Sequence, residues 1–223
     1  MQNSKRVTIF MGHYGSGKTF VSVNYAINLK KHHNNVEIYD LDIVNPYFRT
    51  IDAKDLLAKH DIHLTVSPYA QTNVDLPAMN AGSYKMTDDL SSYAVVDVGG
   101  DDRGALALGR FSNSLIKENN YDVLWVVNSF RPETRDIEGA LEIKREIESV
   151  CDLRFTGIVN NANLGLETTV EHIKTGYKFC EELSKETGLP VKFSSVRKDL
   201  ISEKLNDLGK ILPVEPIKYG DWL

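Results

Sequence analysis

Residues 12–19 read GHYGSGKT and match the phosphate-binding pattern G-x-x-x-x-G-K-[ST]. In such a loop the backbone N–H groups point inward at phosphate oxygens, and the lysine brings positive charge to the β- and γ-phosphates. The hydroxyl after the lysine reaches Mg²⁺. We therefore predict a catalytic role for Lys18 and a metal-binding role for Thr19. The residues predicted to contact the nucleotide here are Gly12, His13, Tyr14, Gly15, Ser16, Gly17, Lys18, Thr19 and Phe20.

The residues around this loop favour the same interpretation over a chance glycine-rich turn. The apolar, β-prone run 7–11 precedes it, and Phe20, Val23 and Ile27 follow at helical spacing. A strand, a loop and the N-terminus of a helix together form an anion-binding arrangement, because the helix dipole adds positive charge at that end. The sequence therefore predicts nucleotide binding at the end of the first strand.

Carboxylates follow two later apolar runs. Asp40 and Asp42 come at the end of the second run, where one could hold Mg²⁺ through water and the other could orient an attacking water. Asp97 ends the fourth run in the position of a Walker B aspartate, and Gly100 follows with an N–H that could reach a γ-phosphate. We predict that Asp42 is catalytic. The residues predicted to bind the metal ion are Thr19, Asp40, Asp42 and Asp97. The alternatives are a solvated acidic turn at Asp40 and a glycine-rich turn after Asp97.

Asparagines end the sixth apolar run, at Asn160 and Asn161. An amide offers both a donor and an acceptor, which suits the edge of a purine base. An ordinary asparagine-rich turn is the alternative.

Strand-like and helix-like segments alternate along the whole chain. Strands are expected near 7–11, 36–39, 62–66, 94–98, 123–127, 155–159 and 191–194. Continuous apolar runs such as 124–127 suit strands that helices cover on both faces. The fold class predicted is therefore α/β, a single doubly wound, mostly parallel sheet flanked by helices, in one domain spanning 1–223. Ligands bind such sheets at the carboxyl ends of the strands.

Composition narrows the class of protein. The 223 residues carry a net charge of −5, and we therefore do not expect a general nucleic-acid-binding protein. Cys151 and Cys180 form no C-x-x-C and are expected to be buried or idle thiols in a reducing compartment. No apolar run approaches the ~20 residues of a membrane span, and the start of the chain leaves no room for a signal peptide. We therefore expect a cytoplasmic protein without a membrane partner.

Taken in order, these motifs resemble the MinD/ParA branch of P-loop nucleotidases, which includes the cobyrinate-synthase and dethiobiotin-synthetase relatives. Residues 40–42 resemble its D-x-D switch I, and 97–100 its switch II. Residues 128–136 resemble its N-P-E…R-D segment. The resemblance implies ATP and Mg²⁺ as cofactors, often coupled to homodimerisation, and implies that Asn160, or alternatively Asn161, reads adenine.

The chain departs from that branch at His13, where MinD and ParA carry a signature lysine that crosses the dimer. A mostly neutral imidazole is a poor substitute. The arginines that could replace the charge are Arg49, Arg103, Arg131 and Arg135. The family's I-P-x-D base loop is also lacking, and Asp199 could stand in for its acid. No basic amphipathic helix of the MinD membrane-anchor kind ends the chain.

Two functions fit best. The first is a Mg-dependent ATPase that acts as a nucleotide-controlled switch, with a possible homodimer or an unidentified protein partner. The second is an ATP-dependent small-molecule kinase or ligase-type enzyme related to dethiobiotin synthetase, whose metabolite could bind near 67–90. A GTPase metallochaperone would need an N-K-x-D motif, whereas the chain has Asn-Asn-Ala-Asn at 160–163. An iron–sulfur protein would need cysteines flanking the nucleotide, and Cys151 and Cys180 lie in the wrong elements.

Overall fold

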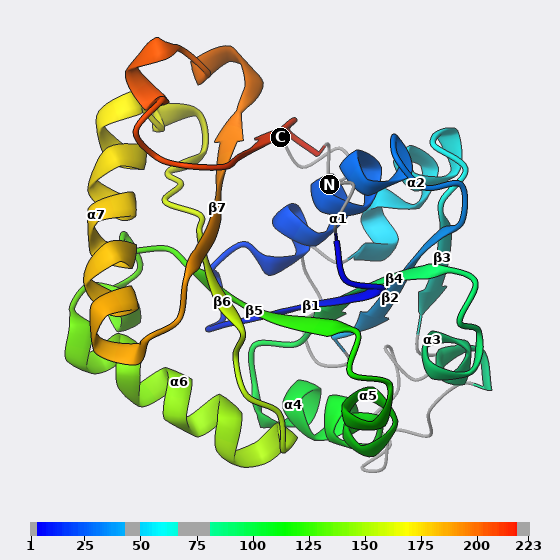
Figure 1. Cartoon of the computed structure of the whole chain (residues 1–223). Coiled ribbons are helices and arrows are strands. Elements are labelled where there is room, and N and C mark those ends of the chain that lie inside the picture. Colours follow the sequence, from blue (N-terminus) through cyan, green and yellow to red (C-terminus); the bar gives the residue numbers. More distant parts are fainter. Residues whose placement is uncertain (1–3, 43–49, 67–80, 218–223) are drawn as a thin grey trace.

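The computed structural model describes residues 4–42, 50–66 and 81–217. Its centre is one sheet of eight parallel strands in the order β3-β2-β4-β1-β5-β6-β7-β8, flanked by helices (Figure 1). The predicted fold class, a single doubly wound parallel sheet, is confirmed. The first strand, β1, lies near the middle of the sheet. The loop that follows it therefore lies near the middle of the row of strand carboxyl ends.

The sequence predicted seven strands, and the sheet has an eighth. The added strand, β8, pairs with β7 at one edge of the sheet, where Pro213 is tolerated because an edge strand needs fewer N–H donors. The strands are β1 (Val7–Met11), β2 (Val36–Leu41), β3 (His63–Val66), β4 (Tyr93–Val98), β5 (Tyr121–Val127), β6 (Gly157–Asn160), β7 (Val191–Arg197) and β8 (Ile211–Val214).

Seven α-helices occur in the part of the chain that the structure describes. They are α1 (Lys18–Lys30), α2 (Lys54–Lys59), α3 (Lys85–Asp88), α4 (Asp102–Gly109), α5 (Ser112–Glu118), α6 (Ile137–Cys151) and α7 (Val170–Thr187). Short 3-10 turns join them, at Thr50–Ala53, Ala81–Tyr84, Pro132–Thr134, Gly165–Glu167, Lys198–Leu200 and Glu203–Leu205. No described helix is long and apolar enough to cross a bilayer.

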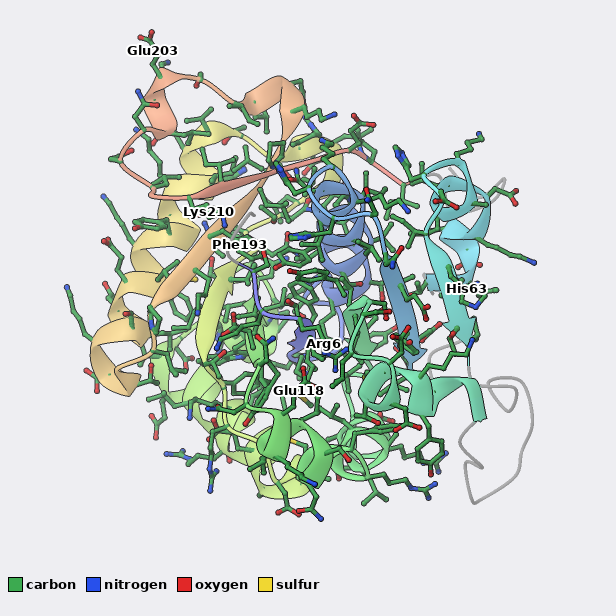
Figure 2. All side chains as sticks on the ribbon, turned by 45° about the vertical axis from the view of Figure 1, so that its right-hand side comes forward. Arg6, His63, Glu118, Phe193, Glu203 and Lys210 are labelled. Carbon is green, nitrogen blue, oxygen red and sulfur yellow. The ribbon has the colours of Figure 1, made fainter. Side chains whose placement is uncertain are left out.

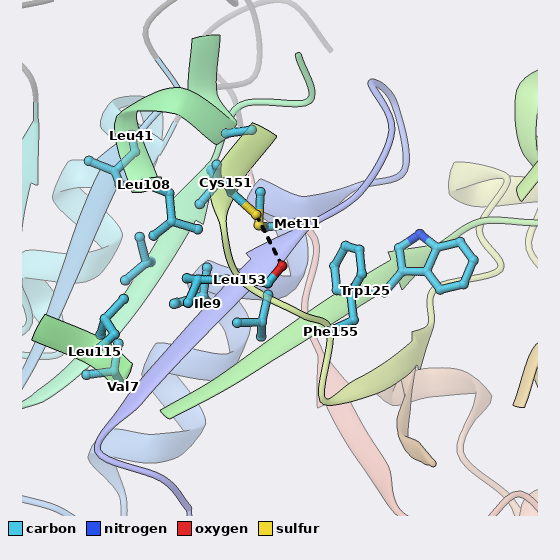
Figure 3. Close-up of a cluster of buried hydrophobic side chains, with 14 of the residues drawn as sticks. Val7, Ile9, Met11, Leu41, Leu108, Leu115, Trp125, Cys151, Leu153 and Phe155 are labelled. Carbon is cyan, nitrogen blue, oxygen red and sulfur yellow. Dashed lines mark hydrogen bonds between the residues drawn. The ribbon is translucent and has the colours of Figure 1, made fainter. Parts of the chain in front are cut away.

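The strands bury side chains on both faces, because helices cover both sides of the sheet. In β1, Ile9 packs into the cluster under α4 to α7, and the next residue, Phe10, packs into the cluster under α1 and α2. Figure 3 shows part of the first cluster, in which Trp125 lies beside Phe155. Cys151 and Cys180 are buried free thiols within it, as predicted.

The starts of α6 and α7 are set by nearby side chains. Pro132 opens a short 3-10 turn, and α6 begins only at Ile137, where the Asp136 carboxylate accepts from the N–H of Gly139. At α7 a capping box is present, in which the Thr169 hydroxyl accepts from the N–H of His172 and the His172 ring accepts from the N–H of Thr169. Both helices therefore begin at side-chain caps that satisfy otherwise free N–H groups.

At the amino ends of the strands, Arg6 joins β1 to two other segments. Its Nε and one terminal nitrogen donate to the Glu118 carboxylate, each over 2.5 Å. The guanidinium also donates to the carbonyls of Met86, Asp89 and Ser92. Arg6 and Glu118 lie close together in Figure 2. These contacts connect the start of β1 to α5 and to the segment before β4, at the amino ends of the strands. The phosphate-binding loop lies at the opposite, carboxyl ends.

Candidate functional site

The phosphate-binding loop leads from the end of β1 directly into α1. Gly17 is the residue before the helix and has a left-handed backbone with φ of 86°, which glycine adopts without strain. A Cβ at this position would also collide with the Asn161 amide. The helix begins at Lys18, and no side chain caps its first N–H groups. These donors therefore face the loop at the positive end of the helix dipole.

Lys18 is buried at the centre of this loop, with 6% of its surface exposed. Its ammonium donates to the His13 carbonyl over 3.1 Å. Burial lowers the pKa of Lys18, while the carboxylates of Asp97, Asp42 and Asp101 oppose that change. The loop thus holds one buried cation among three carboxylates, a balance that a phosphate would alter by adding negative charge beside the lysine.

Asp97 ends β4 with its carboxylate buried beside Thr19 and Thr50. The Thr50 hydroxyl donates to Oδ2 over 2.8 Å, while Oδ1 has no hydrogen-bond partner within the described ranges. Burial raises the pKa of Asp97 to about 6, and the Thr19 and Thr50 hydroxyls and the Lys18 charge act against that rise. A buried carboxylate oxygen beside the Thr19 hydroxyl fits the oxygen ligands that Mg²⁺ prefers.

Asp40 is the register partner of Asp97 on the neighbouring strand β2, and both side chains are almost fully buried. Asp40 Oδ1 accepts from the N–H of Asp42 over 2.9 Å. However, the described residues hold no group of three or more acidic, histidine or cysteine side chains arranged for a metal ion. The three predicted aspartates therefore do not form one ligand cluster. Mg²⁺ sites need only one or two carboxylates together with phosphates and water, so the metal roles of Thr19, Asp40, Asp42 and Asp97 stay predictions.

The turn after β4 packs against the phosphate-binding loop. A Cβ on Gly100 would lie 2.7 Å from the Tyr14 N and 2.8 Å from the Lys18 ammonium. Only glycine fits at this approach. The next residue, Asp101, caps α4 by accepting from the N–H of Gly104. The structure therefore places Gly100 beside Lys18, and the predicted contact of its N–H with a γ-phosphate stays a prediction.

A cavity of about 770 Å³ extends from the phosphate-binding loop across the carboxyl ends of β5 to β8. Its lining comes from the loop and the start of α1 at one end, and from the segments after β6, β7 and β8 at the other. The lining residues are Tyr14, Gly15, Ser16, Gly17, Lys18, Thr19, Phe20, Asp42, Asn128, Phe130, Arg131, Asn161, Ala162, Asn163, Leu164, Gly165, Leu166, Thr168, Ile173, Ser195, Arg197, Val214, Pro216 and Ile217.

The structure does not support the prediction that Asn160 reads a base. Its amide donates to the Ile173 carbonyl and the Ser194 hydroxyl, and its oxygen accepts from the N–H of Ala162. The side chain is 1% exposed and does not line the cavity. Asn161 does line it, but its amide donates to the Ser16 carbonyl over 2.7 Å and its oxygen accepts from Ser195. Both asparagines therefore hold the loops of the site together.

His13 and Asp199 also lie apart from the cavity lining. The His13 ring contacts the Tyr14 carbonyl through Nδ1 and lies 3.9 Å from the Glu133 carboxylate. Asp199 is exposed and forms an ion pair with Arg197. Arg103 is exposed at the start of α4, and Arg135 is exposed beside Asp136. Arg49 and the predicted substrate residues between 67 and 80 fall outside the described residues.

Sequence reasoning missed three parts of the cavity. Asn128 joins two of its loops by donating to the Asn163 carbonyl over 3.0 Å. Arg197 was not singled out, because it matches no motif. The segment after β8 forms one wall, and its Glu215 backbone exchanges two hydrogen bonds with the Asn24 side chain of α1. The apolar run 211–214 was the one available signal for this wall.

Comparison with solved structures supports the fold. The chain is similar to FtsY of Mycoplasma mycoides (16% identity, TM-score 0.56) over 88% of its length and 61% of that chain. It is also similar to the cell division protein FtsY of Thermotoga maritima (16%, TM-score 0.58), covering 85% of this chain and 61% of that one. A third structure is the signal recognition particle receptor FtsY of Elizabethkingia anophelis in complex with GDP (14%, TM-score 0.54), covering 85% and 56%.

These neighbours share the P-loop NTPase fold, and the chain spans about three fifths of their length or less. No family description matches the sequence, and no curated protein matches it either. The narrower resemblance to the MinD/ParA branch stays a prediction.

Proposed function

We propose that this chain binds a nucleoside triphosphate with Mg²⁺, hydrolyses it slowly and acts as a nucleotide-controlled switch. The observation that carries the proposal is the continuous cavity between the phosphate-binding loop and the ends of β6 to β8. The loop supplies uncapped helix N–H groups and the buried Lys18 for the phosphates. The cavity, with its volume of about 770 Å³ and its apolar wall, is large enough to take a nucleoside as well.

Each residue at the phosphate end of the cavity would have its own role in binding and hydrolysing the nucleotide. Thr19 and Asp97 would hold Mg²⁺, which neutralises phosphate charge when it is bound. Lys18 would neutralise the β- and γ-phosphates. Asp42 lines the cavity on the side of Lys18 and would orient the attacking water through its carboxylate. Gly100, packed against Lys18, would offer its N–H to the γ-phosphate and so connect the turn before α4 to the state of the nucleotide.

We propose ATP as the preferred nucleotide. Guanine presents adjacent N–H donors that a carboxylate recognises well, because an ionised carboxyl group only accepts hydrogen bonds. Among the described residues that line the cavity, Asp42 is the one acidic side chain, and it belongs to the phosphate end. The FtsY neighbour crystallised with GDP makes guanine the competing possibility.

Competition between ATP and GTP for a labelled nucleotide tests the proposal. We expect ATP to displace the label at a lower concentration than GTP. The Lys18→Ala variant should lose most nucleotide affinity while its circular dichroism spectrum stays that of a folded protein. Equal or tighter GTP binding would refute the adenine preference, and unchanged affinity of Lys18→Ala would refute the phosphate site.

Hydrolysis should stop when EDTA removes Mg²⁺ and return when Mg²⁺ is restored. Turnover measured with and without metabolite pools separates the switch from the kinase or ligase alternative. Tyr84 and Lys85, which belong to the described part of the predicted substrate segment 67–90, are exposed and do not line the cavity. We therefore expect turnover without any metabolite.

A further inference from the structure

Arg197, the last residue of β7, lines the cavity on the wall formed by the segments after β6, β7 and β8. Its Nε and one terminal nitrogen donate to the two carboxylate oxygens of Asp199, over 2.6 and 3.0 Å. Its other terminal nitrogen donates to the Gly165 carbonyl over 3.1 Å. Since the N–H groups of a guanidinium all lie in its plane, these three hydrogen bonds fix that plane between two loops.

The Gly165 loop is itself rigidly built. The Thr168 hydroxyl donates to the Gly165 carbonyl and accepts from the N–H of Leu164, over 2.8 Å each. The Asn163 side chain accepts from the N–H of Gly165. Arg197 therefore donates to the Gly165 carbonyl of this hydrogen-bonded loop on one side and to both carboxylate oxygens of Asp199 on the other. The hydrogen bond to Gly165 distinguishes this arrangement from an isolated surface ion pair.

These hydrogen bonds lie in the plane of the guanidinium and so engage its edge and not its faces, and the Arg197 side chain lines the cavity. Arg197 is about one fifth exposed. The neighbouring wall is apolar and is formed by Leu164, Leu166, Val214 and Ile217. A fixed, flat cation beside apolar side chains suits an aromatic heterocycle, because guanidinium planes stack on aromatic rings.

The same cavity reaches Lys18 at one end and Arg197 at the other. We propose that Arg197 is the platform on which the base of the bound nucleotide stacks. This inference rests on the proposed function and adds the residue that holds the base. Stacking engages a ring face and not a polar edge, so Arg197 serves adenine and guanine alike. The choice between the two bases therefore belongs to other groups of the site.

Calorimetric titration with two probes, ATP and inorganic tripolyphosphate, each with Mg²⁺, tests the proposal. Tripolyphosphate carries the phosphate charge without a base, so it reports on the loop alone. The variants are Arg197→Ala and Arg197→Lys, which keeps the charge and removes the plane. The matched control is Lys198→Ala, which removes an equal charge from the next residue, an exposed one paired with Glu215.

We expect both Arg197 variants to bind ATP about 5- to 100-fold more weakly and tripolyphosphate within twofold of the wild-type affinity. Lys198→Ala should bind both probes like the wild type. Equal weakening for both probes, or full ATP affinity in Arg197→Lys, would overturn the stacking role. A wild-type protein that binds tripolyphosphate no more weakly than ATP would also overturn it, while leaving the phosphate site intact. Failure of the wild type to bind either probe would instead overturn the proposed function.

Discussion

Arg131 donates from Nε to the Gly15 carbonyl across 2.8 Å, so a residue after β5 is attached to the phosphate-binding loop. The Cδ, Nε and Cζ atoms of Arg131 lie against Gly15, where a Cβ would contact them at 3.5 to 3.8 Å. Within the described part of the chain, the two terminal nitrogens of Arg131 have no hydrogen-bond partner, and the side chain lines the cavity. Arg131 is therefore the arginine that the fold brings to the loop, whereas Arg103 and Arg135 are exposed elsewhere.

We predict that Arg131→Ala weakens ATP binding by about 10- to 100-fold. A charged hydrogen bond is worth about 1.5–3 kcal/mol, and this substitution removes a cation from the phosphate end of the cavity. The control is Arg135→Ala, four residues later, whose side chain is 76% exposed and does not line the cavity. Titration calorimetry measures both variants. Similar affinities for the two would show that Arg131 only braces the loop.

Asp42→Asn is expected to lower the turnover number by about 10²- to 10⁴-fold and to change ATP affinity much less. The substitution keeps the size of the side chain and removes the group that would accept a proton from water. Asp55→Asn, on the exposed face of α2, is the matched control and should keep full activity. Phosphate release under saturating ATP gives the rate. Normal turnover in Asp42→Asn would move the catalytic role to another residue, with Asp40 the next to test.

ATP alone should not drive a tight symmetric dimer of this chain. His13 occupies the position of the cross-dimer lysine, and its ring contacts the Tyr14 carbonyl within the same loop. Two nucleotide-bearing faces would bring many phosphate charges together without a lysine from the partner copy to offset them. Light scattering of the Asp42→Asn variant with ATP and Mg²⁺, compared with ADP, measures the mass. An ATP-dependent dimer would contradict the prediction, and Arg131→Ala would then test the substitute cation.

Arg6→Leu should destabilise the fold by about 3–5 kcal/mol, because it leaves the Glu118 carboxylate and three carbonyls without their donor. The matched control is Arg154→Leu, which removes a 78% exposed partner of Glu148 and should cost less than about 1 kcal/mol. Urea unfolding gives both values. Because Arg6 lies at the opposite edge of the sheet, ATP affinity should be unchanged in the folded Arg6→Leu protein. A loss as small as that of Arg154→Leu would show that the contact contributes little.

The sequence by itself determined the phosphate-binding loop, seven of the eight strands and the strand-end positions of Asp40 and Asp97. These features are local, because loop chemistry and apolar runs depend on residues that are neighbours along the chain. The parallel sheet followed from the alternation of strands and helices. The burial of Cys151 and Cys180 was predicted because the two cysteines lie far apart and form no C-x-x-C.

Only the tertiary structure decided which side chains face the cavity. Asn160 and Asn161 look alike in the sequence, but the close packing of α7 at Gly176 buries the first, and the loop at Ser16 engages the second. Arg131 and Arg197 reach the cavity through contacts with Gly15 and Gly165, more than thirty positions away. Such placements depend on how distant segments pack, because each of these polar groups must find a partner wherever the fold buries it. No local pattern encodes that choice.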